Sequence, residues 1–362
     1  MPRRPVGRDI PMLFDAPVPC QAHPCGEWIM LIPVTAKGSS PSGAKLVFFA
    51  LCLLCLAPLV QLPPEVASAV APAALIGGAA LALTLGNPYS ARTKPISKKL
   101  LQASVVLLGF SMDIAKVAQA GKDGLIFSLI SILAVFGLGW ALQRALKVRP
   151  VTGLLVSAGT AICGGSAIAA ISSVVEAPEE DVSVAVGTVF LLNAVALLIF
   201  PPLGHLLGLS QHQFGVWAGI AIHDIASVVG AGTSYGTEAL DVATAVKLSR
   251  VLYLVPITFI TAYFHHRSSA REEAGERKTM QIPWFVGLFL LASAARSLLP
   301  IVADHASDIK KVASAGFALS LFFIGTALSR ATLKSVGTRP LVLGVLLWLF
   351  ISVAAFLAVR FG

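Results

Sequence analysis

Four ionisable side chains lie deep inside apolar stretches of this sequence, where they are expensive to bury and are therefore candidates for function. His223 and Asp224 are adjacent near the centre of the stretch 214–236, and Lys247 and Arg250 lie near the centre of the stretch 238–260. Two cations, one acid and one imidazole at this depth are suited to binding an anion and carrying protons.

Lys247 and Arg250 are three residues apart, so they share one face of a helix. At 1.5 Å per residue, Arg250 lies about 16 Å from the outer end of its segment, near Ala239, too deep to reach a membrane surface easily. An arginine fork matches the geometry of a tetrahedral oxyanion. We therefore expect the pair to face a water-filled cavity that holds an anion. The alternative is that Arg250 only neutralises Asp224.

His223 and Asp224 point about 100° apart on a helix, so they need not pair with each other. Each is a candidate proton carrier, and we expect the pair to couple transport to an ion gradient. Ser227, one turn beyond His223, is a candidate substrate ligand. The alternative is a structural pair that binds neighbouring backbone.

Gly164 and Gly165 lie halfway along the apolar segment 151–175 and predict a break in its helix. A break exposes amides at the start of the second half-helix, which suit an anion, and Ser166 adds a hydroxyl. The alternative is a packing face of small residues. Asn193, in segment 183–208, is a further candidate ligand or a hydrogen bond between helices.

Composition indicates the elements that position these residues. Of 362 residues, 56% are hydrophobic and 12% are charged, about half the charge of a soluble domain. This excludes a cytosolic enzyme, a disordered protein and a nucleic-acid-binding module, despite a net charge of +9. We predict an all-α, polytopic membrane helix bundle with about eleven transmembrane helices. The expected segments are 44–62, 66–86, 97–116, 121–142, 151–175, 183–208, 214–233, 239–264, 283–303, 311–330 and 339–360.

Loop charges predict the orientation. Basic residues such as Arg144, Lys147 and Arg149 fall in alternate loops, while the acidic loop 176–181 falls on the other side. The positive-inside rule then places the N-terminus in the cytoplasm. Residues 1–43, rich in Pro, Gly and Arg, are expected to be a disordered cytoplasmic tail before a transmembrane domain at 44–362.

A short internal sequence similarity suggests inverted repeats, which are a signature of secondary transporters. Residues 107–121 resemble residues 323–337. We expect no metal and no cofactor, because Cys52 and Cys55 lie in an apolar helix without nearby ligands, and Cys20, His23 and Cys25 lack a fourth ligand.

In order and spacing, the stretches GTAICGGSAIAA, EEDVSVAV, FGVWAGIAIHDIASVV and VKLSRVLYLVP resemble the YeiH-like sulfate exporters of bacterial inner membranes. The resemblance runs from about residue 44 to the C-terminus. It implies a relation to bile-acid/sodium symporters and sodium/proton antiporters, with broken core helices from two inverted repeats. Ile225 departs from the family pattern after the His-Asp pair.

The residues and the resemblance together predict a secondary transporter, not an enzyme, that exports sulfate or a sulfonate-like oxyanion across the bacterial inner membrane. The expected partners are the anion and the lipid bilayer, with a homo-oligomer left open and no nucleic acid. A passive anion channel is one alternative. The other is an intramembrane serine hydrolase, because Gly164-Gly165-Ser166-Ala167 mimics a nucleophile motif and His223 is a candidate base.

Overall fold

The computed structural model describes residues 42–60, 63–268, 284–328 and 336–361. The predicted tail, with its cysteines, thus lies almost wholly outside the described residues. Within them the chain forms helices and no strand, which confirms the all-α prediction. The helices are α1 Ser42–Leu54, η1 Ala57–Leu59, α2 Pro64–Thr84, α3 Ser90–Gly109, α4 Ile114–Ala145, α5 Pro150–Ala161, α6 Gly165–Val174, α7 Glu179–Leu206, α8 Gln211–Ala221, α9 Ile225–Tyr235, α10 Thr237–Leu252, α11 Leu254–Ser268, α12 Trp284–Leu298, α13 Pro300–Asp304, α14 Ala306–Thr326 and α16 Thr338–Phe361.

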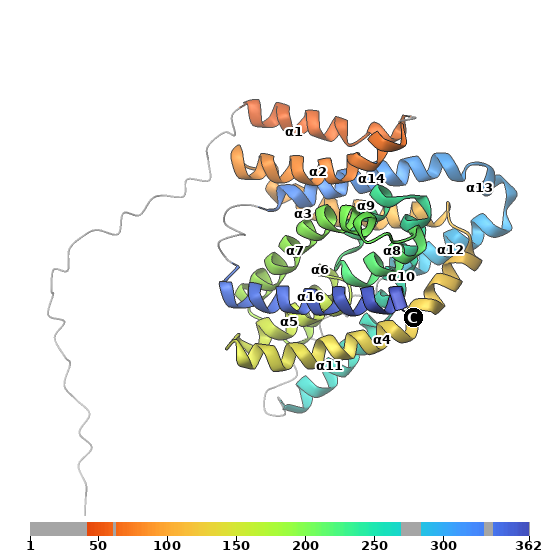
Figure 1. The fold of residues 1–362 in the computed structure, drawn as a ribbon. Coiled ribbons are helices and arrows are strands. Elements are labelled where there is room, and N and C mark those ends of the chain that lie inside the picture. Colours follow the sequence, from red (N-terminus) through yellow and green to blue (C-terminus); the bar gives the residue numbers. More distant parts are fainter. Residues whose placement is uncertain (1–41, 61–62, 269–283, 329–335, 362) are drawn as a thin grey trace, which may run out of the picture. The chain divides into compact units, whose positions relative to one another are not determined.

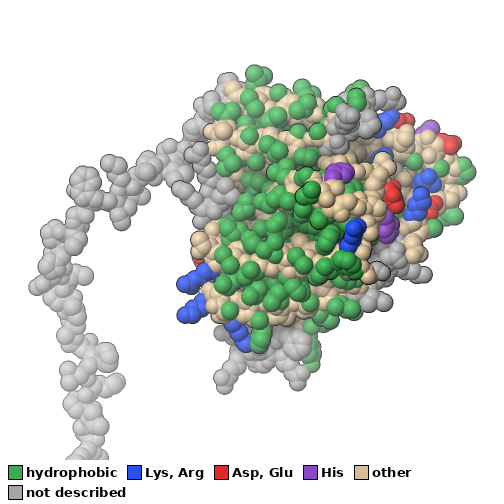
Figure 2. Space-filling view, viewed as in Figure 1, with side chains coloured by type: hydrophobic (Ala, Val, Ile, Leu, Met, Phe, Trp, Pro, Cys, Tyr) green, Lys and Arg blue, Asp and Glu red, His purple; other side chains and the backbone are tan. Residues whose placement is uncertain are grey.

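The surface of the described bundle is apolar where a bilayer would cover it. Among the described residues, five stretches are long and apolar enough to cross a membrane: 127–145, 179–206, 237–263, 306–326 and 338–361. Large side chains such as Leu133, Ile130 and Leu291 are at least 60% exposed, whereas a soluble protein avoids large apolar patches. Figure 2 shows apolar side chains across the middle of one face, with charged residues gathered toward its two ends. The chain is therefore a multi-pass membrane protein.

One group of helices contains α1, α2, α3, α12 and α14, with α14 packed on both α2 and α3 (Figure 1). Glycines allow α2 and α14 to touch at the level of their backbones. A Cβ on Gly78 would lie 2.2 Å from the carbonyl oxygen of Phe322, and one on Gly325 would lie 2.3 Å from that of Leu75. Such small-residue contacts are typical of helix pairs in membranes.

A second group, made of α4 to α11 and α16, gathers around α10, which packs against α4, α8 and α9. Helix α4 packs on α5, α5 packs on α7, and α16 covers α5 and α8. Helix α9 also reaches α2 and α14, so it lies where the two groups meet. This second group contains every residue that the sequence singles out as a candidate ligand or proton carrier.

Candidate functional site

The fifth predicted segment is a hairpin whose arms, α5 and α6, begin and end on one side of the bundle. Arg149, before α5, has Nη1 3.0 Å from Glu180 Oε2 and Nε 3.5 Å from Asp181 Oδ1 at the start of α7. Thr152 in α5 donates a hydrogen bond to Asp181. Gly164, with φ 66° and ψ −130°, makes the reversal, in a conformation that glycine adopts most readily.

The seventh predicted segment is a second hairpin, formed by α8 and α9. The rings of Phe214 and Tyr235, one from each arm, stack with centroids 3.8 Å apart. Tyr235 Oη donates to the carbonyl of Leu209 over 2.6 Å. At the same mouth, the Glu238 amide donates to Gln211 Oε1 over 3.0 Å. Both arms therefore open on the same side.

These contacts correct the prediction that segments 151–175 and 214–233 cross the bundle, because each turns back inside it. The ion pair between Arg149 and Glu180 also shows that the acidic loop 176–181 lies on the same side of the bundle as Arg149, and not on the opposite side as the loop charges predicted. The physical reason is that two half-helices folded as a hairpin use the same length of apolar sequence as one crossing helix. Only contacts between the ends of the segment distinguish the two arrangements.

The hairpins open at opposite ends of the long helix α4. Near its start, Lys116 shares a cavity of about 550 Å³ with His212 and Glu238, at the mouth of the second hairpin. Near its end, Gln143 contacts Gly153 of the first hairpin. The two hairpins thus enter the bundle from opposite sides.

The tips of the two hairpins touch inside the bundle. A Cβ on Gly164 would lie 3.2 Å from Asp224 Cβ and 3.5 Å from the carbonyl carbon of His223. The break between α5 and α6 lies at residues 162–164, beside the predicted glycine pair, which confirms that prediction. The second break lies at residues 222–224, so His223 and Asp224 occupy the unwound tip and not a continuous helix.

Asn193 of α7 holds the second tip in place. Its Oδ1 accepts hydrogen bonds from the amides of His223, over 3.0 Å, and Asp224, over 3.4 Å. Its Nδ2 is buried and has no partner. Asn193 therefore positions the tip through its oxygen, and its amide nitrogen has no partner among the described residues.

Asp224 caps the N-terminus of α9. Its carboxylate accepts from the Ser227 amide over 2.9 Å and from Ser227 Oγ over 2.8 Å. A carboxylate at this end of a helix is stabilised by the exposed amides and the helix dipole. Ser227 is thus committed to Asp224 in this structure.

Arg250 reaches from α10 to the C-terminal end of α5. Its Nη1 donates to Ser131 Oγ of α4 over 2.9 Å, and its Nη2 donates to the carbonyl of Ala161, the last residue of α5. In the described part of the chain it forms no ion pair with Asp224, so the alternative that it only neutralises Asp224 is not what the structure shows. The guanidinium is fully buried, and its Nε has no partner.

Lys247 lies one turn before Arg250 and is fully buried, and its ammonium has no hydrogen-bond partner among the residues that the structure describes. It is within electrostatic range of Cys163 and Asp224, one residue from each hairpin tip. Both ring nitrogens of His223 and the hydroxyl of Thr160 are also buried without partners. A group of orphaned polar atoms at one place is unusual in a folded protein and points to an internal ligand or water site.

Ser166 lies in the first turn of α6 but is exposed, whereas His223 is fully buried. Neither ring nitrogen of His223 has a hydrogen-bond partner, so the Ser166–His223 dyad of a hydrolase is not assembled here. Gly165 is half-buried, and a Cβ there would meet the ring of Phe190 at 3.2 Å. The predicted ligands Lys247, Arg250, Asn193 and Gly164 thus meet at the tips, while Ser166 lies to one side.

A signal that the sequence interpretation missed is a repeat with a constant spacing of 60 residues. It relates α5, α6 and α7 to α8, α9 and α10, with opposite orientations in the bundle. The residue pairs that match at this spacing are Ala158-Gly159 with Ala218-Gly219, Ala161-Ile162 with Ala221-Ile222, Asp181-Val182 with Asp241-Val242 and Ala185-Val186 with Ala245-Val246. The separate similarity that the sequence predicted, between 107–121 and 323–337, stays a prediction, because residues 329–335 are outside the described part.

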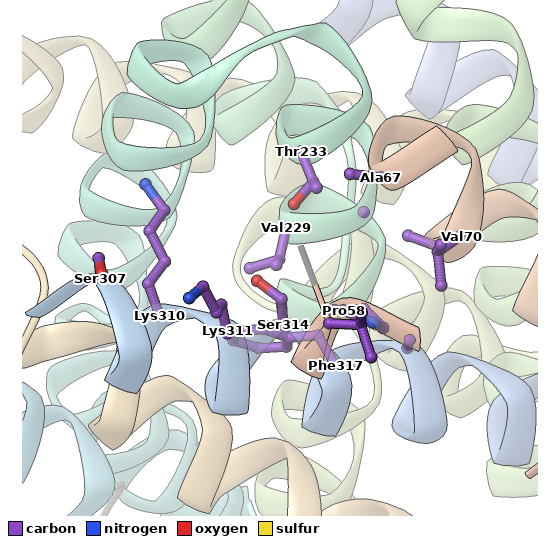
Figure 3. Close-up of a pocket in the computed structure, with 14 residues that line it drawn as sticks. Pro58, Ala67, Val70, Val229, Thr233, Ser307, Lys310, Lys311, Ser314 and Phe317 are labelled. Carbon is purple, nitrogen blue, oxygen red and sulfur yellow. The ribbon is translucent and has the colours of Figure 1, made fainter. Parts of the chain in front are cut away.

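A cavity of about 520 Å³ runs beside the second hairpin, between α9, α2 and α14 (Figure 3). Val229 and Thr233 of α9 face Lys311 and Ser314 of α14 across it (Figure 3). Nearby, Lys310 Nζ is 3.4 Å from Asp241 Oδ1, an ion pair that links α14 to α10. The cavity therefore follows the arm that leads to the second tip.

Comparison with known proteins places the chain in one family. Residues 45–344 match the family model described as "Conserved hypothetical protein 698". A "UPF0324 membrane protein" from Bacteroides thetaiotaomicron is 45% identical over 80% of this chain and 86% of its own length. One from Bdellovibrio bacteriovorus is 42% identical over 88% and 95%, and one from Porphyromonas gingivalis is 46% identical over 78% and 85%. No solved structure matches. The chain belongs to the UPF0324 membrane protein family.

Proposed function

We propose that this protein is a secondary transporter that exports a small oxyanion, such as sulfate or a sulfonate, across the bacterial inner membrane. The observation that carries the proposal is Lys247, a fully buried ammonium without a partner, at the point where two opposed hairpins meet. An uncompensated buried charge is strongly unfavourable. An anion that enters the tip region supplies the missing partner.

The predicted residues have distinct roles in this proposal. Lys247 and the amides of Gly165 and Ser166 at the start of α6 bind the anion, while the Gly164 amide already donates to the Gly159 carbonyl over 2.9 Å. Arg250 contributes charge and fixes the end of α5 through Ala161. Asn193 and Ser227 hold the second tip in shape. His223 and Asp224 take up the coupling ion.

The arrangement of the hairpins supports a transporter over an open channel. They enter from opposite sides and touch at Gly164 and Asp224, so the two tips leave no gap between them at this contact. Half-helices that meet around a central site are typical of secondary transporters. The resemblance of the sequence to the YeiH-like exporters supports an oxyanion as the substrate.

The charge distribution supports a cytoplasmic position for the mouth of the first hairpin. Arg144, Lys147 and Arg149 lie at the mouth of the first hairpin. At the other end, Gln213 Nε2 donates to the carbonyl of Val359 near the C-terminus, over 3.4 Å. With the basic mouth in the cytoplasm, the 520 Å³ cavity opens toward the outside.

The test is flux in proteoliposomes loaded with radiolabelled sulfate or methanesulfonate. Uptake is measured with a proton gradient, with a sodium gradient and with neither. We expect accumulation against the anion gradient that is lost in Lys247→Met and kept in Lys99→Met, which removes an exposed lysine on α3. Flux that only dissipates an anion gradient indicates a channel. No flux of either anion overturns the proposal.

A further inference from the structure

The repeat makes the two tips equivalent in sequence position and unequal in charge. At the N-terminus of α9, the carboxylate of Asp224 accepts from the first-turn amide of Ser227. The equivalent position at α6 is Gly164, which has no side chain, and α6 has no side-chain cap. Only the thiol of Cys163 lies against the Ala167 amide. The N-terminus of α9 is thus capped by a carboxylate of the protein itself, and the N-terminus of α6 is not.

Two of the three charged groups at the tips are already matched by backbone. Asp224 is matched by amides at the start of α9, and Arg250 is matched by the Ala161 carbonyl at the end of α5. Each sits at the helix end whose partial charge is opposite to its own. Lys247 has no such partner.

The surroundings contribute no further compensating charge in the described chain. The first hairpin offers Cys163, and the second offers His223 and Asp224. Helix α10 supplies Lys247 and Arg250, and the groups that α4 and α7 bring to the tips, Ser131 and Asn193, are uncharged. With His223 neutral, two positive charges and one negative charge leave a surplus of one positive charge.

We propose that the tip site is loaded with one net negative charge, as a monovalent oxyanion alone or as a divalent oxyanion together with one proton. This inference rests on the proposed function and adds the charge of the load. The anion takes, at the start of α6 and on Lys247, the place that the Asp224 carboxylate takes at the start of α9. With a divalent anion, the proton binds to the His223–Asp224 pair, and no net charge remains buried.

The test measures the protons and charges that move with each anion in proteoliposomes. Sulfate and methanesulfonate are the probes, with an internal pH dye for protons and reversal potentials for charge. We expect one proton with each sulfate, none with each methanesulfonate, and the same single net negative charge for both. Sulfate that carries two net charges and no proton overturns the inference while leaving the proposed function intact. No flux of either anion overturns both.

A substitution reverses the expected stoichiometry. Asp224→Asn keeps a capping side chain but raises the surplus to two positive charges, so sulfate should move without a proton and with two net charges. Lys247→Met removes the surplus, and any methanesulfonate flux that survives should require one proton. Asp181→Asn is the matched control, because Asp181 is a buried acid at the mouth of the first hairpin. One proton per sulfate in Asp224→Asn contradicts the inference.

Discussion

Replacing Gly164 by alanine tests whether the contact between the hairpin tips matters. The residue has φ 66° and ψ −130°, and holding a non-glycine residue in such a region costs about 1–3 kcal/mol. The added Cβ also lies 3.2 Å from Asp224 Cβ, closer than carbon atoms normally pack. The tips must therefore separate by a few tenths of an ångström or the turn must change.

The matched control is Gly208→Ala. Gly208 has φ +64°, but a Cβ there meets nothing within 4 Å. Both substitutions place a side chain at a positive φ, and only the one at Gly164 also pushes on the second hairpin. The difference between the two variants reports the contact between the tips together with the strain of the Gly164 turn at ψ −130°.

The assay is thermal unfolding of the detergent-purified protein, followed by anion flux in proteoliposomes. We expect Gly164→Ala to lower the unfolding temperature more than Gly208→Ala and to reduce flux about tenfold or more, since about 1.4 kcal/mol corresponds to a factor of ten. Equal stability of the two variants, together with full flux in Gly164→Ala, refutes the reasoning.

Three further predictions concern other contacts. Arg250→Lys keeps the charge but not both hydrogen bonds, so loss of the bond to Ala161 should destabilise the protein by about 1.5–3 kcal/mol; unchanged thermal unfolding contradicts this. Gly78→Ala places a methyl group 2.2 Å from the Phe322 carbonyl oxygen, so α2 and α14 must part, and reduced unfolding temperature in detergent checks it. The Asp113 carboxylate accepts from the amide two residues on in α4, which lowers its pKa. Asp113→Ala should therefore cost about 1 kcal/mol at neutral pH. The gap in unfolding temperature should close as the pH falls below the ordinary carboxyl pKa of about 3.9, and a gap that persists in acid argues against a charged cap.

The sequence was sufficient to locate most of the apolar stretches that form helices, because apolar run length and breaking residues act locally. The glycine pair at 164–165 predicted the first break, and α6 begins at Gly165. The buried depth of Lys247 and Arg250 also followed from their place in an apolar segment. No break was predicted at His223 and Asp224, which were placed on a continuous helix. The chain unwinds at residues 222–224, where Asn193 accepts from the amides of both residues and Asp224 accepts from the Ser227 amide.

Tertiary structure alone decided the path of the chain and the partners of the site. Hydropathy is identical for a crossing helix and for a re-entrant pair of half-helices, so only the contacts of Arg149 with Glu180 and of Phe214 with Tyr235 reveal the hairpins. Arg250 was expected beside an anion or Asp224, yet it binds the end of α5. Such partners come from distant parts of the sequence, and local composition and spacing carry no information about which of them meet.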